Sequence, residues 1–231
     1  MADWHTSSLN ALGLSSTYTD QVWCAPLKAI GIYLSAITLK PMSRSRDLEI
    51  FLKRNDSYPQ TICDSWQTLD LRRFGLRVEA EAEWYMREPG QFDQPAKSRL
   101  DISRVRTEDE LREFEAASMA GFEVPFSGAP FSVHAPGILS DSRMAIFVGR
   151  VEAKVVSVGM SYASAGVVGI YGIATLPAYR RRGYGEAITR AAIGFAPQVR
   201  AVLDPSPLGA GLYRRLGFRS VGRFRRWVST S

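Results

Sequence analysis

The feature that most constrains this chain is a run of arginines followed by two closely spaced glycines, Arg180-Arg181-Arg182-Gly183-Tyr184-Gly185. Glycine adopts backbone angles that other residues avoid, so two glycines one residue apart allow a sharp bend and a close approach to a ligand. If a helix begins here, its first main-chain N–H groups point outward and favour an anion. The arginines add planar, permanently charged donors for phosphate oxygens. The run therefore predicts a turn that binds a diphosphate.

The residues on both sides fit a strand before this turn and a helix after it. Residues 167–176 (VVGIYGIATL) are uncharged and rich in β-branched side chains, as in a buried strand, and Pro177 ends the run. Downstream, apolar residues recur at helical spacing until Pro197. The spacing matches neither G-x-x-x-x-G-K-[ST] nor G-x-G-x-x-G, which argues against a nucleoside-triphosphate loop and a dinucleotide fold. The alternative is a surface turn with solvated arginines.

A second segment, residues 206–218 (SPLGAGLYRRLGF), predicts a short capped helix. Ser206 and Pro207 suit the N-cap and the first turn, and Gly217 suits the C-terminal stop. The leucines that lie one turn apart, and that we expect to form the buried stripe, are Leu208, Leu212 and Leu216.

A different face of this predicted helix carries Ser206, Gly209 and Tyr213. That face combines a hydroxyl, a gap without a side chain and a phenol, so a slender ligand could run along it toward the phenol. Alternatively, Tyr213 is only an amphipathic residue at the edge of the core.

Both segments resemble the acetyl-CoA-binding half of the GNAT acyltransferase superfamily. The family's turn, [RQ]-x-x-G-x-[GA], matches Arg180, Gly183 and Gly185. Its later helix, with a small polar residue seven positions before a tyrosine and L-G-F at its end, matches Ser206 and Tyr213. The resemblance covers roughly residues 99–229. It implies an α/β protein with the GNAT fold: a mixed, mostly antiparallel sheet with a splayed central strand pair and flanking helices, in a tandem arrangement.

The resemblance implies a role for each matching position. Tyr213 would be the general acid that protonates the departing CoA thiolate. Main-chain groups at the splayed strand end would bind the pantetheine arm of acetyl-CoA, the acyl donor, and the Ile173 amide would polarise the thioester carbonyl. The turn amides would hold the pyrophosphate. The positions expected to bind the donor are Ile173, Ala174, Thr175, Arg180, Arg181, Arg182, Gly183, Tyr184, Gly185, Glu186, Ser206 and Gly209.

The sequence departs from the family at one important place. Some relatives carry a catalytic glutamate on the strand before the turn, and alignment through the turn places Gly169 there, with Tyr171 two residues on. No carboxylate occurs in residues 154–185. A general base must therefore come from elsewhere, act through water or be unnecessary. The candidate bases are Glu123 and His134, in the stretch where the family places its acceptor-binding loop.

Composition fits a soluble enzyme. The 231 residues, 45% of them hydrophobic, suffice for one large domain or two small ones. No apolar run is long enough to span a bilayer, and no secretory signal is present. Cys24 and Cys63 lack metal spacing and indicate no disulfide framework. We expect a cytoplasmic monomer or homodimer, with no membrane partner and no metal.

The net charge of +6 raises the question of nucleic-acid binding. The arginines near the C-terminus alternate with apolar residues, which suits strands with one solvated face better than a basic patch. No nucleic-acid-binding motif is present, so a nucleic-acid partner is not favoured. The arginines concerned are Arg214, Arg215, Arg219, Arg223, Arg225 and Arg226.

The first hundred residues predict further α/β structure. The expected elements are a strand over 30–39, a helix over 44–52, a helix over 66–74, a strand over 78–86, a strand over 101–105 and a helix over 107–119. Residues 89–96 have the character of a linker. We expect a degenerate GNAT-like or accessory α/β module at 1–95 and the catalytic domain at 99–231.

Three functions remain open. The first is a CoA-dependent N-acyltransferase acting on a small-molecule amine, which a closed aromatic pocket from Trp84, Phe122, Phe126 and Phe131 would favour. The second is a protein lysine or N-terminal acetyltransferase, which an extended groove lined by Glu123 would favour. The third is a CoA-binding regulator without catalysis, against which the presence of Tyr213 argues.

Overall fold

The computed structural model describes residues 1–25, 33–90, 92, 98, 100–123 and 133–230. The chain divides into two compact units, one formed by Met1–Tyr85 with Ser220–Ser231 and one formed by Met86–Arg219. The last strand, β11 (Arg219–Ser229), pairs antiparallel with β4 (Thr61–Asp64). For this reason the expected boundary at 99–231 needs a correction, because residues 220–231 lie with the first unit.

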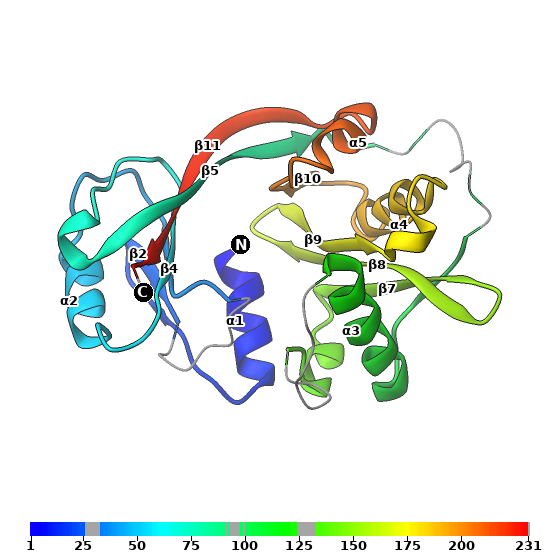
Figure 1. Cartoon of the computed structure of the whole chain (residues 1–231), viewed down its shortest axis with the longest axis horizontal. Coiled ribbons are helices and arrows are strands. Elements are labelled where there is room, and N and C mark those ends of the chain that lie inside the picture. Colours follow the sequence, from blue (N-terminus) through cyan, green and yellow to red (C-terminus); the bar gives the residue numbers. More distant parts are fainter. Residues whose placement is uncertain (26–32, 91, 93–97, 99, 124–132, 231) are drawn as a thin grey trace. The chain divides into compact units, whose positions relative to one another are not determined.

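The second unit, Met86–Arg219, contains both segments that the sequence singles out. Its strands follow the order β6-β7-β8-β9-β10. Neighbours from β6 to β9 are antiparallel, whereas β9 and β10 are parallel, so the sheet is mixed and mostly antiparallel. The elements, shown in Figure 1, are β6 (Asp101–Arg104), α3 (Glu108–Phe122), η2 (Pro136–Ser140), β7 (Met144–Val151), β8 (Lys154–Ser164), β9 (Val167–Thr175), η3 (Pro177–Tyr179), α4 (Tyr184–Ile193), β10 (Arg200–Leu203) and α5 (Ala210–Arg215).

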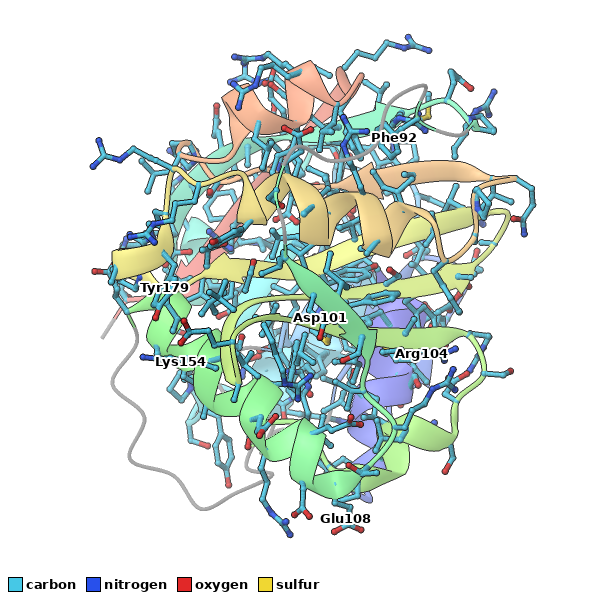
Figure 2. The ribbon with its side chains drawn as sticks, turned by 90° about the vertical axis from the view of Figure 1, so that its right-hand side faces the viewer. Phe92, Asp101, Arg104, Glu108, Lys154 and Tyr179 are labelled. Atoms are coloured by element: carbon cyan, nitrogen blue, oxygen red, sulfur yellow. The ribbon has the colours of Figure 1, made fainter. Side chains whose placement is uncertain are left out.

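Local sequence explains where α3 begins and ends. The Thr107 hydroxyl accepts from the Glu110 amide, and the Glu110 side chain accepts from the Thr107 amide, which is a complete capping box. Glu108 (Figure 2) and its acidic neighbours Asp109 and Glu110 place negative charge in the first turn. This charge lies beside the positive end of the helix dipole and stabilises the helix. The helix ends at Glu123, whose φ of 57° is left-handed. The predicted strand at 101–105 and helix at 107–119 are confirmed as β6 and α3.

Helices α3 and α4 cover opposite faces of β9 (Figure 1). A Cβ added to Gly121 of α3 would lie 2.8 Å from the Cβ of Ala174, so only glycine allows this approach. On the other face, the Ile173 side chain crosses Gly159 toward Ile188 of α4, since a Cβ at Gly159 would lie 2.5 Å from Ile173 and 3.5 Å from Ile188. Consecutive residues of β9 therefore point to different helices, as strand geometry requires.

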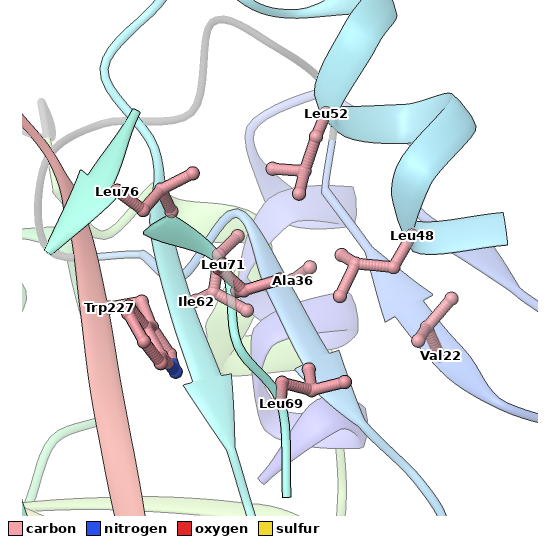
Figure 3. Close-up of a cluster of buried hydrophobic side chains, with 9 residues drawn as sticks. All are labelled: Val22, Ala36, Leu48, Leu52, Ile62, Leu69, Leu71, Leu76 and Trp227. Carbon is pink, nitrogen blue, oxygen red and sulfur yellow. The ribbon is translucent and has the colours of Figure 1, made fainter. Parts of the chain in front are cut away.

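The first unit has its own hydrophobic core (Figure 3). Its strand order is β1-β2-β3-β4-β11-β5, in which β3 and β4 are parallel. Its elements are α1 (Ala2–Ala11), β1 (Thr17–Tyr18), β2 (Val22–Cys24), β3 (Ala36–Thr38), α2 (Arg46–Arg54), β4, η1 (Arg72–Phe74) and β5 (Leu76–Arg87). The buried cluster comprises Val22, Ala36, Leu48, Leu52, Ile62, Leu69, Leu71, Leu76 and Trp227.

Expectations for the first unit hold in part. The strand over 78–86 and the helix over 44–52 are confirmed as β5 and α2. Of the strand expected over 30–39, residues 30–32 lie outside the described part, and β3 covers Ala36–Thr38.

The helix expected over 66–74 is wrong, because only the single turn η1 forms there. The carboxylate of Asp64 accepts from the amides of Trp66 (3.4 Å) and Leu69 (2.9 Å), and Gln67 has a φ of 59°. These side-chain bonds take the amides away from a helical ladder.

Within the described ranges, no helix has the length and apolar character needed to cross a membrane. In the same part of the chain, no three His, Cys, Asp or Glu side chains gather in a way that could hold a metal ion.

Candidate active site

The arginine–glycine turn joins η3 to α4 and contains two left-handed residues, Arg181 (φ 62°) and Gly183 (φ 82°). Gly183 is the N-cap of α4, and no side chain caps this helix. Glycine takes the left-handed conformation without cost, whereas a residue with a Cβ pays roughly 1–2 kcal/mol. Left-handed residues in such a turn make successive N–H groups point to one concave side, where an anion can bind.

The main-chain amides of this turn are available. Among the described residues, none of the amides from Arg181 through Glu186 has a hydrogen-bond partner. The first amide with one is that of Ala187, which donates to the Gly183 carbonyl at 3.1 Å. A helix start with free donors and the positive end of the dipole is suited to binding a phosphate group. The strand over 167–176 and the helix after the turn, both predicted, are confirmed as β9 and α4.

The three arginines of the turn have different surroundings. Arg180 donates to the carbonyls of Thr175 (3.2 Å) and Gly121 (2.8 Å) and forms an ion pair with Glu123 at 2.9 Å. Its guanidinium therefore ties the end of β9 to the end of α3 and has little left to offer a ligand. The candidate base Glu123 is the partner in this ion pair.

Arg182 and Arg181 lie closer to solvent. Arg182 donates to the Ala178 carbonyl at 3.3 Å and lies over the ring of Tyr179, with its guanidinium carbon 5.4 Å from the ring centroid. The ammonium of Lys154 lies 5.6 Å from the same centroid, and Figure 2 shows Lys154 and Tyr179 on one side of the unit. The Arg181 side chain has no partner among the described residues. Two cations, Lys154 and Arg182, thus lie against the Tyr179 ring beside the turn.

The carboxylate of Glu186, also expected at the donor site, is held by Arg190 one turn further along α4, at 2.8 Å. Its amide is among the free donors at the start of the helix.

Strands β9 and β10 separate in the middle of β9, well before the turn. Their parallel pairing joins Val167 to Arg200 and ends at Gly169 with Val202. Residues 170–175 continue as strand, paired with β8 on one side only. The three main-chain positions expected to bind the pantetheine arm, Ile173, Ala174 and Thr175, lie in this unpaired half.

A β-bulge at Gly172 is a feature that the sequence reasoning missed. Between β8 and β9 the register runs from Met160–Tyr171 to Val158–Ala174, so β9 carries one extra residue. Gly172 has a φ of 59°, which a glycine tolerates. An isolated glycine inside a strand pattern is the signal that could have found it. The bulge changes the direction of the β9 backbone in the half of the strand that has no partner in β10.

Tyr213 of α5 is buried, with 8% of its surface exposed. Burial, and to a lesser extent the charge of Asp204, raises the pKa of Tyr213 to about 12. The phenol is therefore protonated at neutral pH. A Cβ at Gly209 would lie 2.8 Å from the ring, so the glycine makes room for the phenol. The Ser206 hydroxyl accepts from the Gly209 amide at 3.2 Å. The three residues expected on one face do lie together.

The predicted helix over 206–218 needs two corrections. Ser206 makes the expected cap bond, but the regular helix starts only at Ala210. Leu208, expected in a buried stripe, is 94% exposed, whereas Leu216 is buried. Residues 207–209 form a hydrogen-bonded turn, closed by the bond from the Ala210 amide to the Ser206 carbonyl at 3.0 Å, and the regular helix follows it.

His134 is not placed as a solvated base would be. It is 4% exposed and packs against Phe114, with ring centroids 5.7 Å apart. Burial lowers the pKa of His134 to about 4, so the imidazole is neutral at physiological pH. The carboxylate of Glu115 accepts from the amides of Val133 and His134. The Nδ1 atom of His134 has no hydrogen-bond partner among the described residues.

The aromatic residues proposed for an acceptor pocket do not come together in the described part. Phe126 and Phe131 lie outside the described residues. Phe122 is 52% exposed, and Trp84 packs on Phe224 in the first unit at a centroid distance of 4.5 Å.

Comparisons with known proteins agree with this geometry. Residues 142–220 match the family model described as "Acetyltransferase (GNAT) domain". No curated protein matches the sequence at a significant level. Among solved structures, a GCN5-related N-acetyltransferase from Kribbella flavida is 18% identical with a TM-score of 0.67, over 100% of this chain and 95% of that one.

Two further structures show the same fold. A conserved protein of unknown function from Staphylococcus epidermidis has a TM-score of 0.64 and 16% identity, over 92% of both chains. A GCN5-related N-acetyltransferase from Sphaerobacter thermophilus has a TM-score of 0.58 and 16% identity, over 90% of this chain and 76% of that one. Residues 142–220, which contain β9, the turn, α4 and α5, thus match the acetyltransferase domain of the GNAT superfamily, and the whole chain has the fold of the GCN5-related N-acetyltransferase from Kribbella flavida.

Proposed function

We propose that this chain transfers an acetyl or short acyl group from a CoA thioester to a primary amine of a small-molecule acceptor. The observation that carries the proposal is the set of free amides from Arg181 through Glu186, next to the half of β9 that has no partner in β10. The amides supply donors for the pyrophosphate, and the open edge of β9 supplies main-chain groups for the pantetheine arm.

The reaction is written as a direct attack. The amine nitrogen forms a bond to the thioester carbonyl carbon, the carbon–sulfur bond breaks, the nitrogen loses one proton, and the CoA sulfur leaves as a thiol. Holding both substrates side by side supplies much of the rate. No enzyme nucleophile is required.

Tyr213 has a definite part in this scheme. A phenol with a pKa of about 12 is a weaker acid than a thiol, whose usual pKa is near 8.5. The phenol therefore acts by donating a hydrogen bond to the sulfur as negative charge develops there, and the burial that raises its pKa strengthens this bond. The proton that the thiol finally carries is the one lost by the amine.

The first test is binding of CoA itself. Saturating CoA should raise the melting temperature by mass action on the folded state, and titration calorimetry gives the Kd. The second test is a panel of small amines, lysine peptides and N-terminal peptides, incubated with acetyl-CoA, with free thiol as the readout. Turnover restricted to peptides would contradict the small-molecule assignment. CoA binding without turnover would indicate a regulator.

A further inference from the structure

The Tyr171 ring lies folded back over Gly169 on strand β9. A Cβ built on Gly169 would lie 2.4 Å from the Tyr171 hydroxyl oxygen, 2.5 Å from Cε2 and 2.7 Å from Cζ. The whole outer edge of the ring therefore occupies the space that a side chain at position 169 would fill. Gly169 is needed because no other residue leaves room for the phenol in this place.

This position coincides with the point where the sheet opens. Gly169 is the last residue of β9 that pairs with β10, and Tyr171 is the second residue of the unpaired half. The phenol thus lies over the fork at which β9 and β10 part, next to the edge that the proposed thioester arm would occupy.

The phenol lies on the α3 face of the sheet. Tyr171 pairs with Met160 and Ala174 pairs with Val158, and Met160 and Val158 are two residues apart on β8. Directly opposed residues, and residues two apart on one strand, point to the same face. Ala174 touches Gly121 of α3, so Tyr171 points to the same face as α3.

Few polar groups are available on this face. Over residues 158–162 of β8 and 169–174 of β9 the side chains pointing toward α3 are Val158, Met160, Tyr162, Tyr171 and Ala174. The Tyr162 hydroxyl bonds to Asp141 at 3.3 Å, at the far side of β8. Among these side chains, the Tyr171 hydroxyl is therefore the polar group nearest to the point where β9 and β10 part.

We propose that the Tyr171 phenol contacts the acceptor amine, accepting a hydrogen bond from its N–H and directing the nitrogen lone pair toward the thioester carbonyl. This inference rests on the proposed acyl transfer. A phenol oxygen accepts such a bond without carrying a charge, which suits a place where the described side chains of β8 and β9 that point toward α3 include no carboxylate. The role of Gly169 is to let the phenol reach the fork, so Gly169 and Tyr171 act as one unit.

The experiment compares two variants that affect the same hydroxyl differently. Tyr171→Phe removes the hydroxyl and keeps the ring. Gly169→Ala keeps the hydroxyl and displaces it, because the flexible end of the ring must move away from the added methyl group. Each should lower kcat/KM for the amine about threefold to tenfold, the usual effect of one lost neutral hydrogen bond. The Kd for CoA and the melting temperature should stay close to those of the wild type.

The double variant and a control separate contact from structure. Gly169→Ala in the Tyr171→Phe background should add less than twofold, roughly, because the two substitutions remove one interaction. Tyr162→Phe removes a phenol hydroxyl on the same face that bonds to Asp141, and should leave kcat/KM for the amine unchanged.

Two results overturn the inference and are distinguishable. If the wild type acetylates an amine and both single variants keep its kcat/KM, Tyr171 does not contact the acceptor and the proposed function stands. If the wild type binds CoA and acetylates no amine of the panel, the proposed function fails, and the role of Tyr171 fails with it.

Discussion

At the scale of single residues, Tyr213 and the turn glycine Gly183 carry the proposed chemistry, and each is testable by itself. Tyr213 is a buried residue with a hydroxyl group. Gly183 has a left-handed backbone and lies at the exposed start of α4. One residue acts through a side chain and the other through the main chain, so their variants should separate turnover from donor binding.

Tyr213→Phe should lower kcat by about 100-fold, as the loss of a hydrogen-bond donor to a developing negative charge does in other enzymes, with little change in the Kd for CoA. Because burial raises the pKa of Tyr213 to about 12, its ionisation should cause no loss of activity up to about pH 11. The measurement is a pH–rate profile of the wild type beside steady-state kinetics of the variant. Equal kcat values would exclude a role for the phenol at the sulfur.

Gly183→Val should weaken CoA binding at least tenfold, roughly, because a β-branched residue both resists the φ of 82° and covers the free amides. The matched control is Gly166→Val, at a φ of 75° in the β8–β9 hairpin, with nothing within 4 Å of an added Cβ. Both variants should lose about 1–2 kcal/mol of stability, since both strain a left-handed position. Only Gly183→Val should change the Kd measured by calorimetry, and an equal loss in both would contradict the cradle.

At the scale of elements, Arg180 connects the end of β9 with the end of α3. Arg180→Ala removes its bonds to the carbonyls of Thr175 and Gly121, and should destabilise the second unit by about 1–3 kcal/mol and weaken CoA binding by moving the turn. Glu123→Gln should change stability by less than about 1 kcal/mol, because the pair with Arg180 is largely exposed. Urea denaturation and the CoA Kd provide the comparison.

The same pair tests a catalytic hypothesis. If Glu123 is the general base, Glu123→Gln should lower kcat far more than it lowers stability. Since its carboxylate is already engaged by Arg180, we expect kcat of the glutamine variant to stay within about threefold of the wild type. A large loss of kcat with unchanged stability would restore Glu123 as the base.

The elements near the turn were predictable because local signals agree there. The glycines, the capping box of α3, and the proline stops all specify the same boundaries that the structure shows. The prediction was wrong where a distant residue or a side chain determines the local backbone conformation. The Asp64 carboxylate diverts the amides after β4, and Leu208 is exposed although its spacing is the same as that of the buried Leu216. Neither effect is visible in hydrophobic periodicity.

Likewise, only some residues of the candidate site could be predicted from the sequence. The turn residues, Tyr213, and Gly209 follow from a local motif. The pairing of Arg180 with Glu123 joins positions 57 residues apart, and the Tyr171 ring over Gly169 depends on which way a side chain folds along the strand. A one-dimensional pattern contains no information on either contact.

At the scale of the whole molecule, the C-terminal arginines illustrate how charge is used. Arg219 pairs with Glu88 at 3.0 Å, Arg225 with Glu81 at 2.7 Å, and Arg226 with Glu79 at 2.6 Å. These cations are thus neutralised by acidic residues of β5 and of the segment directly after it. This arrangement supports our expectation that the excess of arginine serves strands with a solvated face rather than nucleic acid.

We also propose that the first unit is a degenerate GNAT-like module. The support for this proposal is that the helical turn η1 is followed by the left-handed Gly75 and strand β5, in the same order as α5, the left-handed Gly217 and β11. The Kribbella flavida structure matches 100% of this chain, so its fold includes the counterpart of this unit.

The chain contains two histidines, His5 in the first unit and His134 in the second, and both are buried. Burial lowers the pKa of His5 to about 3 and that of His134 to about 4, from an ordinary 6.5. The unfolded chain therefore takes up protons below pH 6.5 that the folded chain does not, so the stability that both groups contribute above pH 6.5 is lost as the pH falls. Carboxylates ionise with ordinary pKa values near 4 and contribute little above about pH 5.

Between pH 6.5 and 5 the free energy of unfolding should consequently fall by up to about 1.4 kcal/mol per pH unit for each histidine. His5→Phe and His134→Phe each keep a ring of similar size and remove the titration, so each should remove about half of this slope, and the double variant should remove nearly all of it. Urea denaturation at pH 7, 6 and 5 measures the slopes. If the double variant retains the wild-type slope, the acid sensitivity of the molecule arises elsewhere. Removal of the slope by one variant alone would show that only one unit limits the stability of the chain.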